Sequence, residues 1–78
     1  MKPNILLVED NETLGYILKE YLEMKGFNIV WRQDGRAGLR AFSRGTFNLC
    51  ILDIMMPEMD GYTLAGKIKG INEDMPLI

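Results

Sequence analysis

The amino-acid sequence predicts an α/β protein with a doubly wound parallel sheet, truncated after a third helix and the start of a fourth strand. Short apolar runs alternate with amphipathic segments along the chain in the order βαβαβα, and residues 76–78 have the composition of a strand just beginning. The connections between these segments are only a few residues long, which favours parallel strands joined by right-handed crossovers. We expect the strand order 2-1-3, in which the first and third strands are neighbours.

The first half of the chain is predicted to form a strand, a helix and a second strand. Residues 4–8 are a continuous apolar run, typical of a strand covered on both faces, and Asn11 can cap the helix that follows. Gly26 stands where the C′ residue of that helix is expected, before a second strand over 27–31. The helix carries an apolar stripe at helical spacing: Leu14, Ile17, Leu18, Tyr21 and Leu22.

The second half is predicted to form two further helices around a third strand. Asp34-Gly35 marks a turn or cap before a weaker helix that Gly45 ends, and residues 47–54 form the strand. Pro57 disfavours helix at the residue before it, so a loop precedes the last helix over 62–71. The outer face of the weaker helix carries three arginines at spacings of four, which we interpret as a solvated face, with partner docking as the alternative: Arg36, Arg40 and Arg44.

Length and composition exclude several classes of protein. The 78 residues form one globular domain at most, which buries only roughly 60–65% of its unfolded surface. The net charge of −2 does not indicate binding to nucleic acid or to a membrane surface. No apolar run approaches the ~18–20 residues of a membrane span. No signal peptide is present, so we expect a cytoplasmic protein, and Cys50 is predicted to be a buried, inert thiol. The absence of histidine removes the usual general base.

Two of the predicted strands end on carboxylates. Glu9 and Asp10 follow the first strand, and Asp53 closes the third. Because neighbouring parallel strands end at the same edge of a sheet, we expect these side chains to share one crevice. Packed carboxylates repel one another unless a cation neutralises them, and oxygen ligands without His or Cys suit Mg²⁺, with Mn²⁺ as the alternative. A carboxylate beside such a metal can act as a nucleophile and form an aspartyl phosphate.

The motifs around these carboxylates carry a family resemblance. Leu7-Val8-Glu9-Asp10-Asn11 and Ile51-Leu52-Asp53-Ile54-Met55-Met56-Pro57-Glu58-Met59-Asp60-Gly61 stand at the ends of the first and third strands, and Asp34-Gly35-Arg36-Ala37-Gly38-Leu39 opens the second helix. With this spacing and order of elements, the chain from Asn4 to Ile78 resembles the flavodoxin-like receiver domain of bacterial two-component response regulators. Each motif alone is modest, and the combination is specific.

The resemblance implies a function and a set of site residues. Asp53 would accept a phosphoryl group from a histidine kinase, Asp10 would ligate Mg²⁺ directly, and Glu9 would hold the ion through water. The backbone carbonyl of Met55 would be a further ligand. The resemblance implies a signalling module rather than an enzyme, beyond Mg²⁺-dependent self-phosphorylation and self-dephosphorylation.

The same resemblance predicts what residues 1–78 leave out. Family members also use a Ser or Thr at the end of the fourth strand and a Lys at the end of the fifth, and both positions lie beyond Ile78. We therefore expect a partial receiver domain without these switch residues and without an effector domain. An incomplete sheet leaves an apolar strand at its edge, so self-association or swapping of elements between copies is predicted.

Two other functions stay open from the residues alone. The chain could be a structural or dimerising fragment that has lost the phosphorylation chemistry by truncation. In a separate structural reading, Glu9 and Asp10 simply favour the start of the first helix. The chain could also be a phosphohydrolase with an aspartate nucleophile. Such enzymes usually have a second acid two residues after the nucleophile, and Met55 occupies that position.

Overall fold

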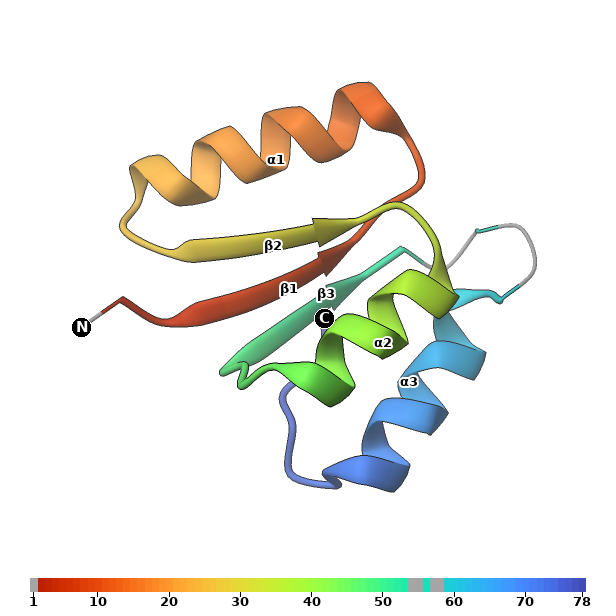
Figure 1. Cartoon of the computed structure of the whole chain (residues 1–78). Coiled ribbons are helices and arrows are strands. Elements are labelled where there is room, and N and C mark those ends of the chain that lie inside the picture. Colours follow the sequence, from red (N-terminus) through yellow and green to blue (C-terminus); the bar gives the residue numbers. More distant parts are fainter. Residues whose placement is uncertain (1, 54–55, 57–58) are drawn as a thin grey trace.

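The protein folds into three layers, with helices on both faces of a parallel sheet. The computed structural model describes residues 2–53, 56 and 59–78. Within these residues the elements are β1 (Asn4–Val8), α1 (Glu12–Met24), β2 (Asn28–Arg32), α2 (Gly35–Arg44), β3 (Leu49–Leu52) and α3 (Gly61–Ile71). Helix α1 covers one face of the sheet, and α2 and α3 cover the other (Figure 1). The predicted doubly wound α/β class is confirmed.

The sheet has the order β2-β1-β3 with every pair parallel. Leu6 at the centre of β1 lies opposite Val30 on one side and Cys50 on the other. Beyond β3, the Ile78 N–H donates to the Cys50 carbonyl at 2.9 Å, so residues 76–78 pair beside β3 where a fourth strand was expected. This order places the carboxyl ends of β1 and β3 next to each other. Self-association through the edge beyond β3 stays a prediction.

Each helix begins at a side-chain cap. The side chains of Asn11, Asp34 and Asp60 each accept a hydrogen bond at 2.8 Å from the backbone N–H three residues later. These bonds satisfy N–H groups that have no partner within the helix. Gly26 follows α1 with a φ of 96°, a left-handed conformation that favours glycine. The predicted boundaries of α1 and α2 therefore follow from local hydrogen bonding.

The main core lies between the sheet and the pair α2 and α3. Its fully buried side chains are apolar and come from β1, β3 and α3: Leu6, Val8, Cys50, Leu64 and Ile68. Burial raises the pKa of the Cys50 thiol to about 11, because the apolar surroundings disfavour the thiolate. The prediction of a buried thiol is confirmed.

The apolar stripe of α1 is only partly buried. Leu14, Ile17 and Tyr21 remain 44%, 55% and 54% exposed, while Leu18 and Leu22 are half-buried. Among the described elements, α1 contacts only β1 and β2, which are too narrow to cover the whole stripe. Within the described residues no helix is long and apolar enough to cross a membrane.

The third strand is shorter than the predicted 47–54. Strand β3 covers only Leu49–Leu52, and Ile54 lies outside the described residues. Phe47 is buried without belonging to the strand, because its ring stacks on Phe42 of α2 with the ring centroids 6.3 Å apart. The apolar character of Phe47 therefore indicated that the residue is buried, and not that it pairs in the sheet. The second strand is displaced by one residue, to Asn28–Arg32 from the predicted 27–31.

Candidate metal centre

Three carboxylates gather at the carboxyl edge of the sheet. Glu9 and Asp10 follow β1, and Asp53 follows β3. One oxygen atom of each lies within 4.8 Å of an oxygen of the other two. Glu9 is only 8% exposed, Asp53 is half-buried and Asp10 is exposed, so the cluster opens to solvent on the Asp10 side. The expectation that these three side chains meet is confirmed.

Backbone hydrogen bonds hold the strand ends that carry the cluster. The Glu9 N–H donates to the Arg32 carbonyl at 3.0 Å, and the Asp53 N–H donates to the Val8 carbonyl at 2.9 Å. The Glu9 carboxylate in turn accepts from the Asn11 N–H at 3.0 Å. Glu9 and Asp53 therefore stand on main chain that is still bonded to the sheet. A site built on sheet-bonded backbone keeps its geometry more closely than one on a free loop.

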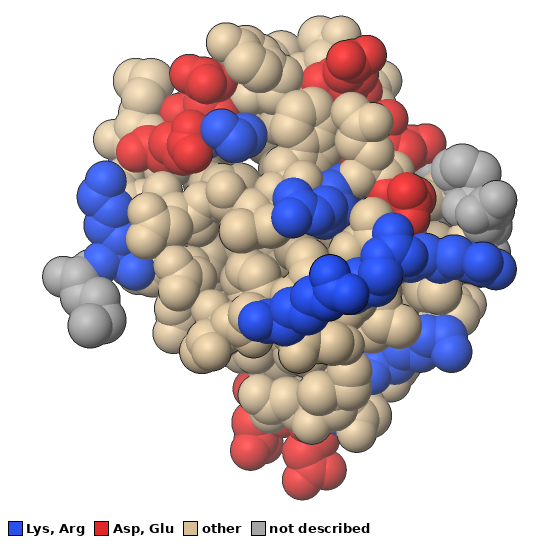
Figure 2. Space-filling model, in the orientation of Figure 1, with Lys and Arg blue, Asp and Glu red and all other residues tan. Residues whose placement is uncertain are grey.

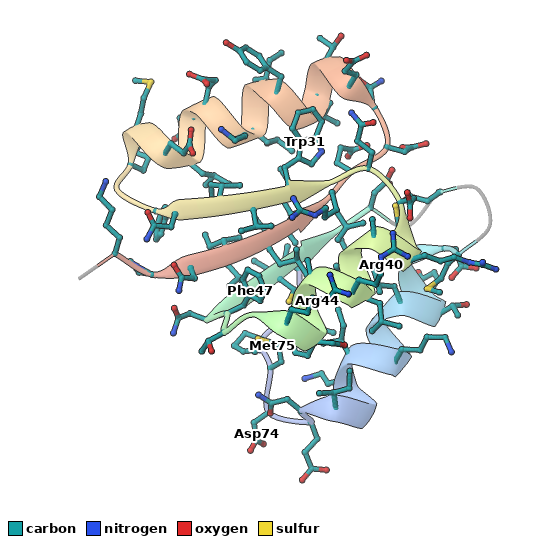
Figure 3. The ribbon with its side chains drawn as sticks, viewed as in Figure 1. Trp31, Arg40, Arg44, Phe47, Asp74 and Met75 are labelled. Atoms are coloured by element: carbon teal, nitrogen blue, oxygen red, sulfur yellow. The ribbon has the colours of Figure 1, made fainter. Side chains whose placement is uncertain are left out.

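Trp31 holds the Glu9 segment from the side of α1. Its indole N–H donates to the Glu9 carbonyl at 3.0 Å, and the ring lies between β2 and α1 (Figure 3). Gly15 of α1 makes room for it, because a Cβ at that position would overlap the indole ring. Sequence reasoning missed this contact, since no periodic pattern links a tryptophan to a backbone carbonyl 22 residues away. The one feature of the sequence that could have indicated this contact is Gly15, a glycine inside an amphipathic helix.

The cluster changes the titration of Glu9. Burial is the largest cause that raises the pKa of this carboxyl, and the neighbouring carboxyl groups of Asp53 and Asp10 raise it further. The hydrogen bond from the Asn11 N–H acts in the opposite direction, and the net pKa lies above the ordinary value of 4.5. A buried carboxylate next to two others is thus disfavoured in its charged form.

This raised pKa predicts that the metal-free protein loses stability as the pH rises. The folded state binds the Glu9 proton more tightly than the unfolded chain does. Raising the pH from the ordinary glutamate pKa through the higher folded-state pKa therefore lowers the free energy of unfolding. We expect urea unfolding in the presence of a chelator to show this decline, and Glu9→Gln to flatten it. Glu20→Gln on exposed α1 is the matched control and keeps the decline; equal slopes in all three proteins contradict the prediction.

The donor atoms of the cluster suit a hard divalent cation. All three side chains offer carboxylate oxygen, and neither His nor Cys belongs to the cluster in the described part of the chain. Mg²⁺ and Mn²⁺ prefer such oxygen ligands, and a cation would offset the repulsion that raises the pKa of Glu9. Met55, whose carbonyl was the fourth predicted ligand, lies outside the described residues.

A comparison with protein families identifies the family in which this fold carries three carboxylates at the carboxyl edge of the sheet. The model of the response regulator receiver domain matches residues 5–78, which include all three carboxylates. The chain belongs to this family. The receiver is therefore a domain of two-component signal transduction and not an enzyme in the ordinary sense, as the sequence motifs indicated.

Curated relatives of this receiver are transcriptional regulators. The regulator RprY from Bacteroides fragilis is 46% identical over 77 residues, which cover 99% of this chain and 33% of the relative. The regulator CssR from Bacillus subtilis is 41% identical over 78 residues, which cover 100% of this chain and 34% of the relative. The chain thus spans about a third of the length of these relatives.

Solved receivers share the fold closely. The response regulator TrrA from Thermotoga maritima, crystallised in complex with Mg²⁺-BeF, is 36% identical, with a TM-score of 0.93 over 99% of this chain and 66% of that chain. TrrA was also crystallised with the histidine kinase ThkA, and that structure gives a TM-score of 0.91. The chemotaxis protein CheY4 from Vibrio cholerae matches with a TM-score of 0.96 at 22% identity, which shows the shared fold alone.

Proposed function

We propose that this receiver accepts a phosphoryl group on Asp53 from a partner histidine kinase, with Mg²⁺ bound by the neighbouring carboxylates. The observation that carries the proposal is the meeting of three carboxylate oxygens within 4.8 Å of one another at the end of two adjacent strands. Two structures of one relative support it, because TrrA was crystallised with Mg²⁺-BeF and also with the histidine kinase ThkA.

The surroundings of each carboxylate suggest its role. Asp10 is exposed and free to ligate the ion directly, whereas Glu9 is buried and engaged with the Asn11 N–H, which suits contact through a water molecule. The Met55 carbonyl is the further proposed ligand. Bound Mg²⁺, or Mn²⁺ in its place, would supply positive charge that offsets repulsion between carboxylates and phosphoryl oxygens.

Asp53 is the proposed nucleophile. A carboxylate oxygen attacks the phosphorus atom of the kinase phosphohistidine, the new O–P bond forms, and the N–P bond breaks. The imidazole of the kinase leaves and takes up a proton from solvent. A carboxylate needs no general base before it attacks, which agrees with a chain that contains no histidine.

The test is incorporation of phosphate from a small phosphodonor such as acetyl phosphate. We expect the intact mass of the chain to increase by one phosphoryl group when Mg²⁺ is present, and no increase when a chelator removes the metal. Equal incorporation with and without chelator would contradict a metal-assisted reaction. No adduct in a chain that still binds Mg²⁺ would favour the structural alternative, and sustained turnover of a phosphomonoester would favour a phosphohydrolase.

The proposal extends to the protein in which this receiver acts. Because the curated relatives are transcriptional regulators and the chain spans about a third of their length, we place the receiver in a regulator of that class, acting in the cytoplasm. Phosphorylation of Asp53 would then be the input that such a regulator receives from its kinase.

A further inference from the structure

A groove of about 300 Å³ lies between β2 and α2, at the edge of the sheet opposite β3. Its walls carry three arginines, Arg32, Arg40 and Arg44. Its floor is apolar and includes Val30, Ala41 and Phe47. Figure 2 shows basic side chains gathered across this face of the molecule, and Figure 3 shows Arg40, Arg44 and Phe47 along it. The groove has no part in the acidic cluster.

Local geometry explains why the three arginines converge. Arg40 and Arg44 are four residues apart on α2, so they lie one above the other on one face of the helix. Arg32 ends β2 two residues after Val30, and alternate residues of a strand share a face of the sheet. The sequence interpretation of a solvated arginine face was therefore incomplete, because β2 adds a third cation, Arg32, and contributes Val30 to the apolar floor.

The charges in the groove have no counterion among the residues that the structure describes. In the described part of the chain, no carboxylate lies within ion-pair distance of these three arginines. Arg32 donates one hydrogen bond at 2.9 Å, to the Trp31 carbonyl, which leaves further guanidinium donors unused. Guanidinium groups pair with carboxylates through two parallel hydrogen bonds, so an acidic ligand would relieve the repulsion among the three.

The apolar floor of the groove favours anionic ligands that also carry an apolar group. Apart from the arginines, its lining offers only apolar side chains and the backbone of Gly45, so no side chain is present to recognise a base or a sugar. A volume of about 300 Å³ admits a few side chains, at the lower end of ligand sites. It is too small for a duplex or a whole helix. The net charge of −2 also gives the rest of the chain no attraction for a long polyanion.

We propose that this groove docks a short acidic segment of a partner protein. An apolar side chain of that segment enters between Val30 and Phe47, and flanking Asp or Glu residues pair with Arg40, Arg44 and Arg32. This interaction goes beyond phosphoryl transfer, because it uses neither the carboxylate cluster nor a metal ion.

The test uses peptide selection with two charge-matched double variants. A display library of random ten-residue peptides is selected on the full chain, and the enriched peptides are labelled for fluorescence anisotropy. Arg40→Gln with Arg44→Gln removes two charges from the groove. Arg36→Gln with Lys67→Gln removes two exposed charges that do not line it. We expect enriched peptides to carry Asp or Glu on both sides of Leu, Ile, Val or Phe.

The affinities decide the outcome. The groove variant should lose about tenfold or more in affinity for the selected peptide, and the control variant should keep its affinity within about twofold. Serine in place of the peptide's apolar residue should also weaken binding. Enriched peptides without an acidic bias, or equal losses in both variants, would overturn the proposal. Binding of phosphatidylserine vesicles or duplex DNA that depends on Arg40 and Arg44, without any peptide binding, would overturn it as well.

Two further measurements keep the result separate from folding and from phosphorylation. Urea unfolding should show that both double variants fold. Incorporation of phosphate from acetyl phosphate should be the same in both, since neither substitution touches the carboxylates. Loss of peptide binding with intact phosphate incorporation is therefore specific to the groove.

Discussion

Replacing Asp53 with asparagine is expected to abolish the incorporation of phosphate in the presence of Mg²⁺. Asparagine keeps the size and shape of the side chain, but its amide oxygen is a poor nucleophile and carries no negative charge. The Asp53 N–H still donates to Val8, so the end of β3 stays in place. Intact mass spectrometry after reaction with acetyl phosphate measures the loss directly.

Asp60→Asn provides the matched control for this change. The Asp60 carboxylate caps α3 by accepting the Thr63 N–H at 2.8 Å, and this bond lowers its pKa. Asparagine is an equally good helix cap, so the fold and the incorporation of phosphate should persist. Incorporation by Asp53→Asn at the parent level would mean that another residue accepts the phosphoryl group. Digestion and peptide mass mapping would then find it.

Gly15→Ala is expected to lower the free energy of unfolding by about 1–3 kcal/mol, although alanine usually favours helices. The added Cβ would overlap the Trp31 ring, so the indole or the whole of α1 must shift. A shifted indole also loses its hydrogen bond to the Glu9 carbonyl. We therefore expect a weaker Mg²⁺ affinity as well. Urea unfolding measures the loss of stability. Titration with Mg²⁺, followed by the fluorescence of Trp31, the only tryptophan of the sequence, measures the loss of affinity.

Gly66→Ala is the matched control for the helix effect. Gly66 lies inside α3 and is exposed, and a Cβ there would meet no atom within 4 Å. Alanine at this position should raise the free energy of unfolding by about 0.5–1 kcal/mol. Stabilisation of similar size by Gly15→Ala would contradict the close packing of Trp31 on α1. Combining Gly15→Ala with Trp31→Leu should recover part of the lost stability, because the two sites share one contact.

The elements of this receiver were largely predictable because they depend on local physics. Helix starts at Asn11 and Asp34 rest on bonds to N–H groups three residues later, and Gly26 supplies a left-handed turn. The limits of β3 were wrong for a physical reason. Apolar composition reports burial, and Phe47 is buried by stacking on Phe42 rather than by pairing in the sheet.

The acidic cluster was predictable for a topological reason. Once Glu9 and Asp53 stand at the ends of two parallel strands, the sheet order brings them to one edge, and the structure confirms that they meet with Asp10. Their roles in binding Mg²⁺ and phosphate stay predictions. From the sequence, only repulsion among the carboxylates was expected. Burial is instead the largest cause that raises the pKa of Glu9.

The sequence by itself determined the alternation of strands and helices, the helix caps and the edge at which the carboxylates gather. These features follow from short-range hydrogen bonds and from the period of apolar residues. Only the tertiary structure decided that Trp31 binds the Glu9 carbonyl and that three of the five residues of the α1 stripe stay exposed. It also decided that Arg32 joins Arg40 and Arg44 around an apolar floor. Such contacts join residues distant in the chain, and their geometry depends on how the helices pack on the sheet, which no local pattern encodes.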